Sequence, residues 1–391
     1  MHTHESLSRA GALAWFARAA ARGNPYAQFN LGMMYKDGDG APRDDVVACR
    51  WLERAARKGL VFAQNHLGTM YFQGRGVAQS DDEATYWFRL AAAQGDASAQ
   101  QNLGDLYRAG RGVPRDTAQA VAWYYKAAEQ ALPSAQRLLA ACYLDGEGVA
   151  RSHPLAMAWF RKAALLDDAE AEVCLGLMYR RGQGVAPSEA EAMYWFRRAA
   201  ARGHAPAQRL LGLSYLAGRG APADALGARA WLECAAEQGD AKAQFTLGVM
   251  YANGQGVRRD EAQAVQWYRR AAEQGDASAQ NNFGVMLANG HGVPQDDAQA
   301  VHWYRLAAEQ GHALAQYNLG GMYNSGRGVA RDTVRSYMWM LLAADAGEPA
   351  ASANKAIVAR RLSQEQIESA IDMRREWRNA RQYAGPERRA A

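Results

Sequence analysis

The sequence predicts an all-α protein, a right-handed α-solenoid superhelix of helix-turn-helix repeats with a 36-residue period. The first observation is tryptophan spacing, because steps of 36 residues from Trp267 reach nine further tryptophans without a gap or insertion. The second is a Gly-x-Gly motif, Gly254 and Gly256 in one copy, that recurs in all nine full repeats. A fixed period of this length is typical of stacked repeats, in which neighbouring units bury apolar faces that one unit cannot bury alone. The nine tryptophans are Trp15, Trp51, Trp87, Trp123, Trp159, Trp195, Trp231, Trp303 and Trp339.

The first half of each repeat predicts an amphipathic helix, helix A. In the copy that precedes Trp267, Ala243, Leu247 and Met250 lie on one face at helical spacing. Gly248 lies inside this helix, where glycine costs about 1 kcal/mol relative to alanine. We therefore expect a second helix to approach so closely that a side chain would not fit. Gly254 ends the helix.

The second half of each repeat predicts helix B, which begins at a position that is always Asp or Ser. Such residues are helix N-caps, because their side-chain oxygens accept hydrogen bonds from free backbone amides of the first turn. The tryptophan and a pair of alanines follow at helical spacing, so we assign the tryptophan column to the core. The N-cap positions are Asp44, Ser80, Asp116, Ser152, Ser188, Asp224, Asp260, Asp296 and Asp332.

The repeat pattern A-x-x-x-L-G-x-x-Y-x-x-G-x-G-V-x-x-D-x-x-x-A-x-x-W-x-x-x-A-A-x-x-G resembles the Sel-one-like repeat family, a relative of tetratricopeptide repeats. The resemblance covers residues 8 to about 362. It implies a non-enzymatic scaffold or adaptor that presents a concave helical groove to other proteins in signalling, regulation or complex assembly. Two repeats depart from the pattern at Ala131, Ala140 and Asp167, where we expect locally altered stacking.

The repeat register predicts four segments along the chain. Residues 1–23 correspond to an orphan helix B from a half repeat, and residues 24–347 to nine full repeats. Residues 348–384 are predicted to form capping helices, with Ser363 and Gln366 as a capping box. Residues 385–391 are expected to be a disordered tail.

Charge and cysteine usage favour a protein partner in a reducing compartment. The 45 basic and 40 acidic residues give a net charge of +5 without blocks of like charge, so nucleic-acid binding is only a remote alternative. The four cysteines show no metal-binding spacing, which favours a cytoplasmic location. A periplasmic or secreted interaction protein stays open, because the short apolar run 10–17 has some features of a signal peptide. No segment is long enough to predict a membrane span.

No catalytic, cofactor-binding or metal-binding residue is predicted. The Gly-x-Gly motif follows a helix and lacks the third glycine of a dinucleotide-binding loop. The histidines form no His-Glu-x-x-His motif, and no nucleophile, base and orienting residue can be assembled. An enzyme is therefore not expected.

Function is expected on the variable face of helix A, which by resemblance to tetratricopeptide repeats lines the concave surface. In the fourth to sixth full repeats this face combines arginines with apolar residues, which suits an acidic amphipathic segment of a partner. These candidate groove residues are Arg137, Val173, Leu177, Arg180, Arg181, Arg209, Leu213 and Leu216.

In the eighth and ninth repeats the same face carries Asn281, Asn289, Tyr317 and Asn324. Amide side chains both donate and accept, so we expect this row to hold the backbone of an extended peptide. Variable surface residues can also be merely solvated. A neighbouring column allows structural bonds between helices instead, and we favour that interpretation for Asn30, Asn102, Asn282 and Asn318.

The N-terminal half repeat is predicted to leave part of Trp15 and Phe16 uncovered, because its own helix A is missing. Exposed apolar surface at the end of a solenoid favours self-association or docking of a partner's helix.

Overall fold

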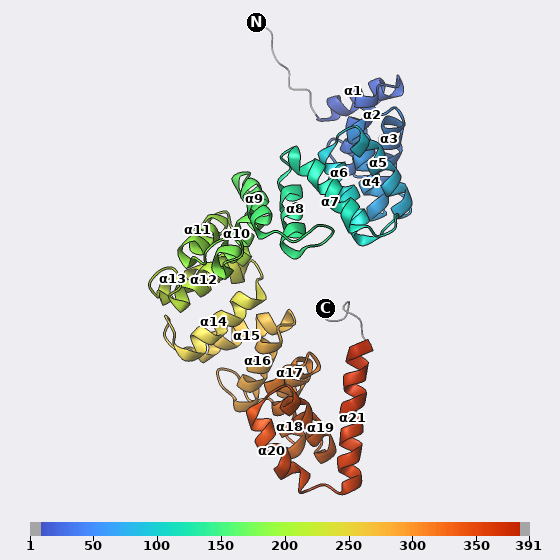
Figure 1. The fold of residues 1–391 in the computed structure, drawn as a ribbon. Helices are drawn as coiled ribbons and strands as arrows, with labels where there is room; N and C mark the ends of the chain where they lie inside the picture. The colour runs from blue at the N-terminus through green and yellow to red at the C-terminus, as the bar shows by residue number, and fades with distance from the viewer. Residues whose placement is uncertain (1–8, 384–391) are drawn as a thin grey trace. The chain divides into compact units, whose positions relative to one another are not determined.

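The computed structural model describes residues 9–383 and contains 21 helices and no strand in that range (Figure 1). The chain forms two compact units, Met1–Trp195 and Phe196–Ala391. Consecutive helices pack in pairs within each unit. The predicted all-helical repeat architecture is confirmed. The predicted tail, residues 385–391, lies outside the described residues.

The first unit contains α1 to α10 and the start of α11. Even-numbered helices are helix A of a repeat and odd-numbered helices are helix B. The bounds are α1 Arg9–Ala21, α2 Pro25–Asp37, α3 Asp45–Arg57, α4 Val61–Gln73, α5 Asp81–Ala93, α6 Ala97–Ala109, α7 Thr117–Glu129, α8 Pro133–Asp145, α9 His153–Leu165, α10 Ala169–Arg181 and α11 Glu189–Ala201.

The second unit begins within α11 and ends with two capping helices, α20 and α21. The bounds of its further helices are α12 Ala205–Ala217, α13 Ala225–Glu237, α14 Ala241–Asn253, α15 Glu261–Glu273, α16 Ala277–Asn289, α17 Asp297–Glu309, α18 Ala313–Ser325, α19 Thr333–Asp345, α20 Pro349–Ala359 and α21 Gln364–Tyr383.

The local signals in the sequence explain why these helices start and stop where they do. The carboxylate of Asp44 accepts a hydrogen bond from the Val47 amide at 2.9 Å, and the other eight predicted N-caps make the equivalent bond. Ala131 and Asp167 adopt φ of 59° and 62°, the left-handed conformation that glycine takes at the equivalent turns. The turn is therefore retained at both positions, at a backbone cost that glycine avoids.

The centre of the core is the residue that follows each tryptophan. Leu52, Phe88, Tyr124 and their equivalents up to Met340 are all 5% exposed or less. This column explains the glycine inside helix A, because a Cβ at Gly68 would lie 2.7 Å from the Phe88 ring. The predicted close approach of the two helices is confirmed.

The assignment of the whole tryptophan column to the core was too broad. Trp87, Trp159 and Trp339 are buried, but six others are half-buried and Trp15 is exposed. Trp87 packs against α3 and α4, so one side of the ring covers the core of the preceding helices. The outer face of several rings is covered by a cation, as in Lys162, whose Nζ lies 3.7 Å from the Trp159 centroid.

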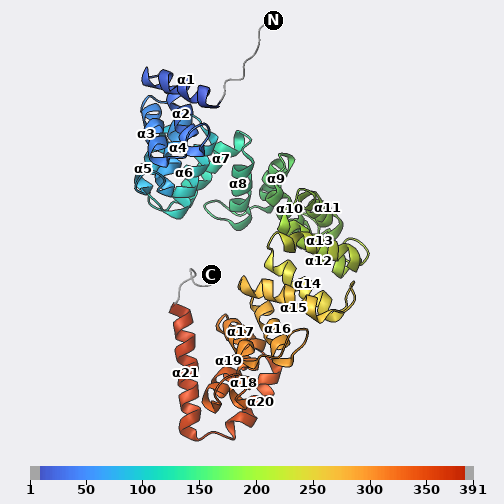
Figure 2. The ribbon, with the colours of Figure 1, turned by 180° about the vertical axis from the view of Figure 1, so that it is seen from behind.

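The C-terminal cap closes the second unit. The predicted capping box is confirmed, because the Gln366 amide donates to Ser363 Oγ and the Ser363 amide donates to Gln366 Oε1. Helix α21 then runs beside α19, as both views show (Figures 1 and 2). Trp377 of α21 meets Trp339 edge-on with ring centroids 6.0 Å apart. The cap therefore covers the core surface that α19 would otherwise expose.

Candidate functional site

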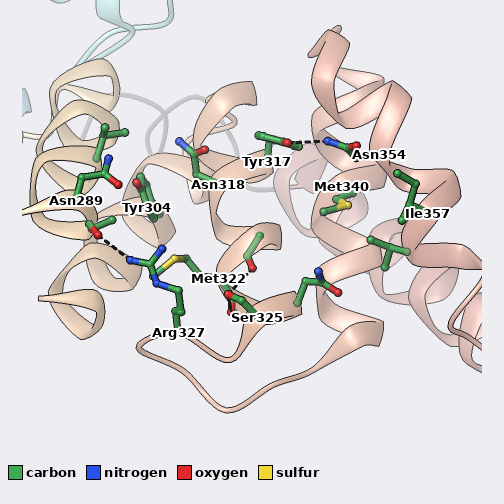
Figure 3. A pocket seen from close by; sticks show the side chains of 15 residues that line it. Asn289, Tyr304, Tyr317, Asn318, Met322, Ser325, Arg327, Met340, Asn354 and Ile357 are labelled. Atoms are coloured by element: carbon green, nitrogen blue, oxygen red, sulfur yellow. Dashed lines mark hydrogen bonds between the residues drawn. The ribbon is translucent and has the colours of Figure 1, made fainter.

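A hollow of about 520 Å³ opens on one face of the second unit, between α16, α18 and α20 (Figure 3). We call it the amide pocket. Its walls come from three successive A-type helices, with further residues from α17, α19 and the loop after α18. Fifteen residues line it: Val285, Ala288, Asn289, Tyr304, Tyr317, Asn318, Gly321, Met322, Asn324, Ser325, Arg327, Met340, Asn354, Ile357 and Val358.

The floor of the amide pocket is apolar. Tyr304, Met322, Met340 and Val358 are buried core residues that reach the hollow from α17, α18, α19 and α20. Burial raises the pKa of Tyr304 to about 12, so its hydroxyl stays neutral at physiological pH. The floor can therefore accept an apolar group without exposing that group to a charge.

The rim of the pocket carries amides and a phenol. Tyr317 Oη accepts a hydrogen bond from Asn354 Nδ2 at 2.7 Å, which links α18 to α20 (Figure 3). Asn318 Nδ2 donates to Asn281 Oδ1 at 2.9 Å, which links α18 to α16. Asn289 is exposed, and its side chain makes no hydrogen bond with the described residues. Its donor and acceptor groups are open to a ligand.

The one charged residue that lines the amide pocket forms an ion pair inside the protein. Arg327 contacts both carboxylate oxygens of Asp297, at 2.7 and 3.0 Å, and also donates to the Ala288 carbonyl at 2.7 Å. These hydrogen bonds hold the pKa of Asp297 below its usual range and raise the pKa of Arg327. The one charged side chain among the lining residues is therefore paired, and Arg361, outside the lining, donates to Asn324 Oδ1 at 3.5 Å.

Gly321 keeps the amide pocket open. A Cβ at this position would meet no atom within 4 Å, whereas a Cβ at the adjacent Gly320 would lie 3.1 Å from the Ser336 carbonyl oxygen. Packing therefore disfavours a side chain at 320 but not at 321. Sequence reasoning missed this residue, although a signal was present, because the equivalent position carries a side chain in all eight other full repeats: Met33, Thr69, Asp105, Ala141, Leu177, Leu213, Val249 and Val285.

The structure brings three of the four predicted amide-row residues together in this pocket, namely Asn289, Tyr317 and Asn324. The fourth, Asn281, is only 1% exposed and bonds to Asn282 and Asn318, so its expected place on an open groove surface is wrong. The predicted role of a hydrogen bond between neighbouring helices is confirmed for Asn318. It also holds for Asn102, which donates to Asn65 at 3.0 Å. Peptide binding by the row stays a prediction.

The predicted arginine-rich zone is divided between the two units. Arg137, Val173, Leu177, Arg180 and Arg181 belong to the first unit, and the remaining three residues belong to the second. The apolar members, Val173, Leu177, Leu213 and Leu216, are half-buried, and Arg181 is exposed.

Three of the four arginines in that zone are already paired. Arg137 contacts Asp168 at 3.2 Å and Glu170 at 2.8 Å. Arg209 contacts Asp240 at 3.0 Å, and Arg180 contacts Glu189 at 3.0 Å. Because these pairs offset much of the positive charge, the electrostatic reason for an acidic ligand is weaker than the sequence indicated. The pairs Arg137–Asp168 and Arg209–Asp240 were missed because each aspartate caps the next helix A, 31 residues further along the chain.

A second hollow, of about 550 Å³, lies between α4, α6 and α8 of the first unit. We call it the charged pocket, because Asp105, Arg108, Arg111 and Arg137 line it. Asp105 accepts a 2.6 Å hydrogen bond from Tyr124 Oη and lies 3.9 Å from Arg108. The polar groups of this pocket therefore satisfy one another to a large extent.

Neither pocket carries recognisable reaction chemistry. Among residues 9–383 no cluster of three or more His, Cys, Asp or Glu side chains is placed to hold a metal ion. All four cysteines are free thiols, and burial raises the pKa of Cys49, Cys142 and Cys174 to about 11, which disfavours the reactive thiolate. In the part of the chain that the structure describes, no helix combines the length and apolar character needed to cross a membrane.

Comparison with known families and structures identifies the repeat. The family described as Sel1 repeat matches ten segments, residues 8–24, 25–60, 61–96, 97–132, 133–168, 169–204, 205–240, 241–276, 277–312 and 313–348. No curated protein sequence matches the chain.

Two crystal structures share the fold at appreciable identity. One is a protective antigen present in uropathogenic Escherichia coli strains displaying an SLR fold, with 34% identity over 96% of this chain and 88% of that chain, and a TM-score of 0.59. The other is a Sel1 repeat protein from Oxalobacter formigenes, with 34% identity over 79% of this chain and 90% of that chain, and a TM-score of 0.63.

Proposed function

Since the chain belongs to the Sel1 repeat family, we propose that it is a non-enzymatic protein-interaction scaffold whose amide pocket docks an extended, uncharged segment of a partner protein. Helical repeat proteins of this kind commonly use extended surfaces to bind other proteins. Family membership supports only the general role, because one fold hosts many functions. The choice of partner segment rests on the pocket.

The single observation that carries this proposal is Gly321. A glycine inside a helix costs about 1 kcal/mol relative to alanine, and here no neighbouring atom requires that cost. The consequence of the missing side chain is space above an apolar floor. A position that lowers helix stability and gains no packing is best explained by a ligand group that enters the space.

The rim indicates a peptide backbone as that ligand. An extended backbone presents alternating N–H and C=O groups, and Asn289, Asn324 and Tyr317 can donate to or accept from such groups. The floor of Tyr304 and Met340 then receives one apolar side chain of the segment. A charged side chain is disfavoured there, because burying a charge without a partner costs much more than burying an apolar group.

The proposal includes a cytoplasmic location, supported by four free cysteines in one chain. Fractionation of native cells with an antibody against the chain tests this part. Recovery in a periplasmic or secreted fraction would contradict the location and leave the pocket chemistry standing.

Selection of peptides from a random displayed library tests the docking site. The target is the full chain, and the counter-target is Gly321→Leu, which fills the hollow. Leucine already occupies the equivalent position at Leu177 and Leu213, so the helix tolerates it. We expect the recovered peptides to be uncharged around one apolar residue and to bind Gly321→Leu at least tenfold more weakly, a loss of about 1.4 kcal/mol.

The matched control is Arg108→Leu, which changes the charged pocket at the position equivalent to Asn324. It should retain binding of the selected peptides. Recovery of mainly acidic or basic peptides, or equal binding to the wild type and Gly321→Leu, would overturn the proposal.

A further inference from the structure

Helix α1 exposes more of one face than helix B does in any of the nine full repeats. Ala19 is half-buried and Trp15 is 53% exposed. Phe16 is also half-buried, whereas its equivalents from Leu52 to Met340 are buried. The equivalents of Ala19 are all 0% exposed: Ala55, Ala91, Ala127, Ala163, Ala199, Ala235, Ala271, Ala307 and Ala343.

Elsewhere in the molecule a helix A of the same repeat covers this face. In the α4–α5 pair, Gly68 of α4 lies against the Phe88 ring, and Phe88 is the equivalent of Phe16. The described residues place no such helix beside α1. A hollow of about 680 Å³ remains instead, lined by Trp15, Arg18, Ala19, Arg22, Gly23 and Asn24.

The position of Arg22 indicates what an occupant must offer. Five of its equivalents are glutamines, and each donates a hydrogen bond from Nε2 to the buried glutamine of its own helix A, at 2.9 Å from Gln130 and 2.7 Å from Gln274. The basic equivalent Lys58 donates to the Gly23 carbonyl instead. A helix on α1 therefore needs an acceptor opposite Arg22. A carboxylate fits best, since a charge-assisted hydrogen bond is stronger than a neutral one.

The charge of the face supports the same conclusion. Arg18 and Arg22 are both exposed, and neither forms an ion pair with any residue in the described range 9–383. If two copies of the protein packed through this face, the two arginines of one copy would lie opposite those of the other. Such like-charge contacts are unfavourable. An acidic partner removes this repulsion.

We propose that the α1 end of the protein is a docking site for an acidic amphipathic helix of a partner protein. Its apolar side packs on Trp15, Phe16 and Ala19, in the place that helix A takes in the other repeats. Its carboxylates lie opposite Arg18 and Arg22. This site is independent of the amide pocket and uses a different class of ligand.

Two synthetic peptides test the proposal on the full chain. Both contain residues 60–73, the α4 helix, because α5 carries a Trp87–Phe88 pair that matches Trp15–Phe16. One carries Gln64→Glu and the other Gln64→Lys, at the position that contacts the equivalent of Arg22. We expect the Gln64→Glu peptide to bind at least tenfold more tightly, measured by fluorescence anisotropy of a labelled peptide titrated with protein at low salt.

Three variants of the protein locate the site. Arg22→Glu should invert the preference between the peptides. Ala19→Trp should abolish binding of both peptides, because the larger side chain fills the hollow on α1. Arg50→Glu, on the exposed face of α3, should leave both affinities within about twofold. Retained melting temperatures show that the variants are folded.

Several outcomes would overturn the proposal. They are the absence of binding, equal binding of the two peptides, or unchanged binding to Ala19→Trp. Concentration-dependent dimerisation that Ala19→Trp removes would assign the face to a second copy. Binding that appears only after deletion of residues 1–8 would assign it to the chain's own N-terminal segment.

Discussion

The amide pocket and the charged pocket occupy the same positions of the repeat, 216 residues apart in the sequence. Twelve of the thirteen residues that line the charged pocket have an equivalent in the lining of the amide pocket. The hollow is therefore a property of the repeat geometry. The side chains that line it differ between the two pockets. That difference shows which positions stabilise the fold and which are candidates for binding a ligand.

Two pairs of equivalent residues behave identically in both pockets. Asn102 and Asn318 each donate to an asparagine 37 residues earlier. Arg111 and Arg327 each contact both carboxylate oxygens of an aspartate 30 residues earlier. These side chains join neighbouring helices and loops, so their presence at a pocket does not indicate a ligand.

The remaining positions separate the pockets. In the charged pocket Asp105 accepts from Tyr124 and approaches Arg108, so one side chain satisfies the next. In the amide pocket the equivalent of Asp105 is Gly321, which fills no space, and Asn289 has an open donor and acceptor. A hollow that keeps an open amide side chain on its rim and has an empty centre is the better candidate for a ligand site.

The largest expected effect tests the core column that both pockets share. Phe88→Ala removes a buried ring next to the charged pocket and should lower the free energy of unfolding by about 3–5 kcal/mol. Trp123→Ala should cost less, because that ring is only half-buried. Urea denaturation of both variants measures which substitution lowers the free energy of unfolding more. A larger loss for Trp123→Ala would restore the tryptophan column as the main core.

The next effect separates Gly104, which packs against helix B of its repeat beside the charged pocket, from Gly321 in the amide pocket. A Cβ at Gly104 would lie 2.6 Å from the Tyr124 ring, so Gly104→Ala should destabilise the protein by about 1–3 kcal/mol. Gly321→Ala meets no atom and should stabilise it by up to about 1 kcal/mol. Thermal denaturation checks both signs. Destabilisation by Gly321→Ala would remove the main reason for a ligand in the amide pocket.

A smaller effect distinguishes Tyr124 from Tyr304, two buried tyrosines at equivalent positions of the repeat. Tyr124→Phe removes the hydrogen bond to Asp105 and should cost about 1–2 kcal/mol. Tyr304 makes no hydrogen bond through its hydroxyl with the described residues, so Tyr304→Phe should change the free energy of unfolding by less than about 0.5 kcal/mol. Similar losses in both variants would mean that the amide pocket is as well satisfied as the charged pocket.

The smallest effect concerns the N-caps of the helices that bear the pockets. His312 Nδ1 accepts from the Ala315 amide at 3.2 Å, and burial lowers the pKa of His312. Protonation is therefore easier in the unfolded chain, so stability falls as the pH drops below about 6.5, the usual histidine pKa. Helix α6 has Asp96 as its N-cap instead and lacks this histidine-dependent loss.

The free energy of unfolding of the wild type falls between about pH 7 and pH 5. His312→Asp should make this fall smaller by up to about 1 kcal/mol. His66, whose pKa is also lowered by burial, accounts for part of the remaining loss. Unfolding curves measured across this range check the difference. A pH dependence unchanged by His312→Asp would show that the cap stays intact when the histidine is protonated.

Most of the architecture was predictable because the signals are local and most of them recur from repeat to repeat. The N-cap aspartates and serines, the helical glycines and the capping box at Ser363 each specify backbone geometry within a few residues of the chain. Burial of the tryptophans was harder to predict, since helical spacing gives a face but not the depth to which neighbouring repeats cover it. The exposed Trp15 and the buried Trp87 share one sequence pattern.

The candidate site was predictable only in part. Variation between repeats singled out Asn289, Tyr317 and Asn324, which line the amide pocket, but it could not separate the buried Asn281 from them. The arginine pairings depend on residues in the next repeat, and the hollow at Gly321 depends on an absent side chain. Both follow from three-dimensional packing, which one-dimensional spacing does not contain.

Isothermal titration calorimetry with one selected uncharged peptide tests the central claim most directly. The same peptide is titrated into the wild type, Gly321→Leu in the amide pocket and Arg108→Leu in the charged pocket. The account predicts a dissociation constant at least tenfold higher for Gly321→Leu and within about twofold of the wild type for Arg108→Leu. Unchanged affinity for Gly321→Leu, with its melting temperature retained, would contradict the assignment of the amide pocket as the docking site.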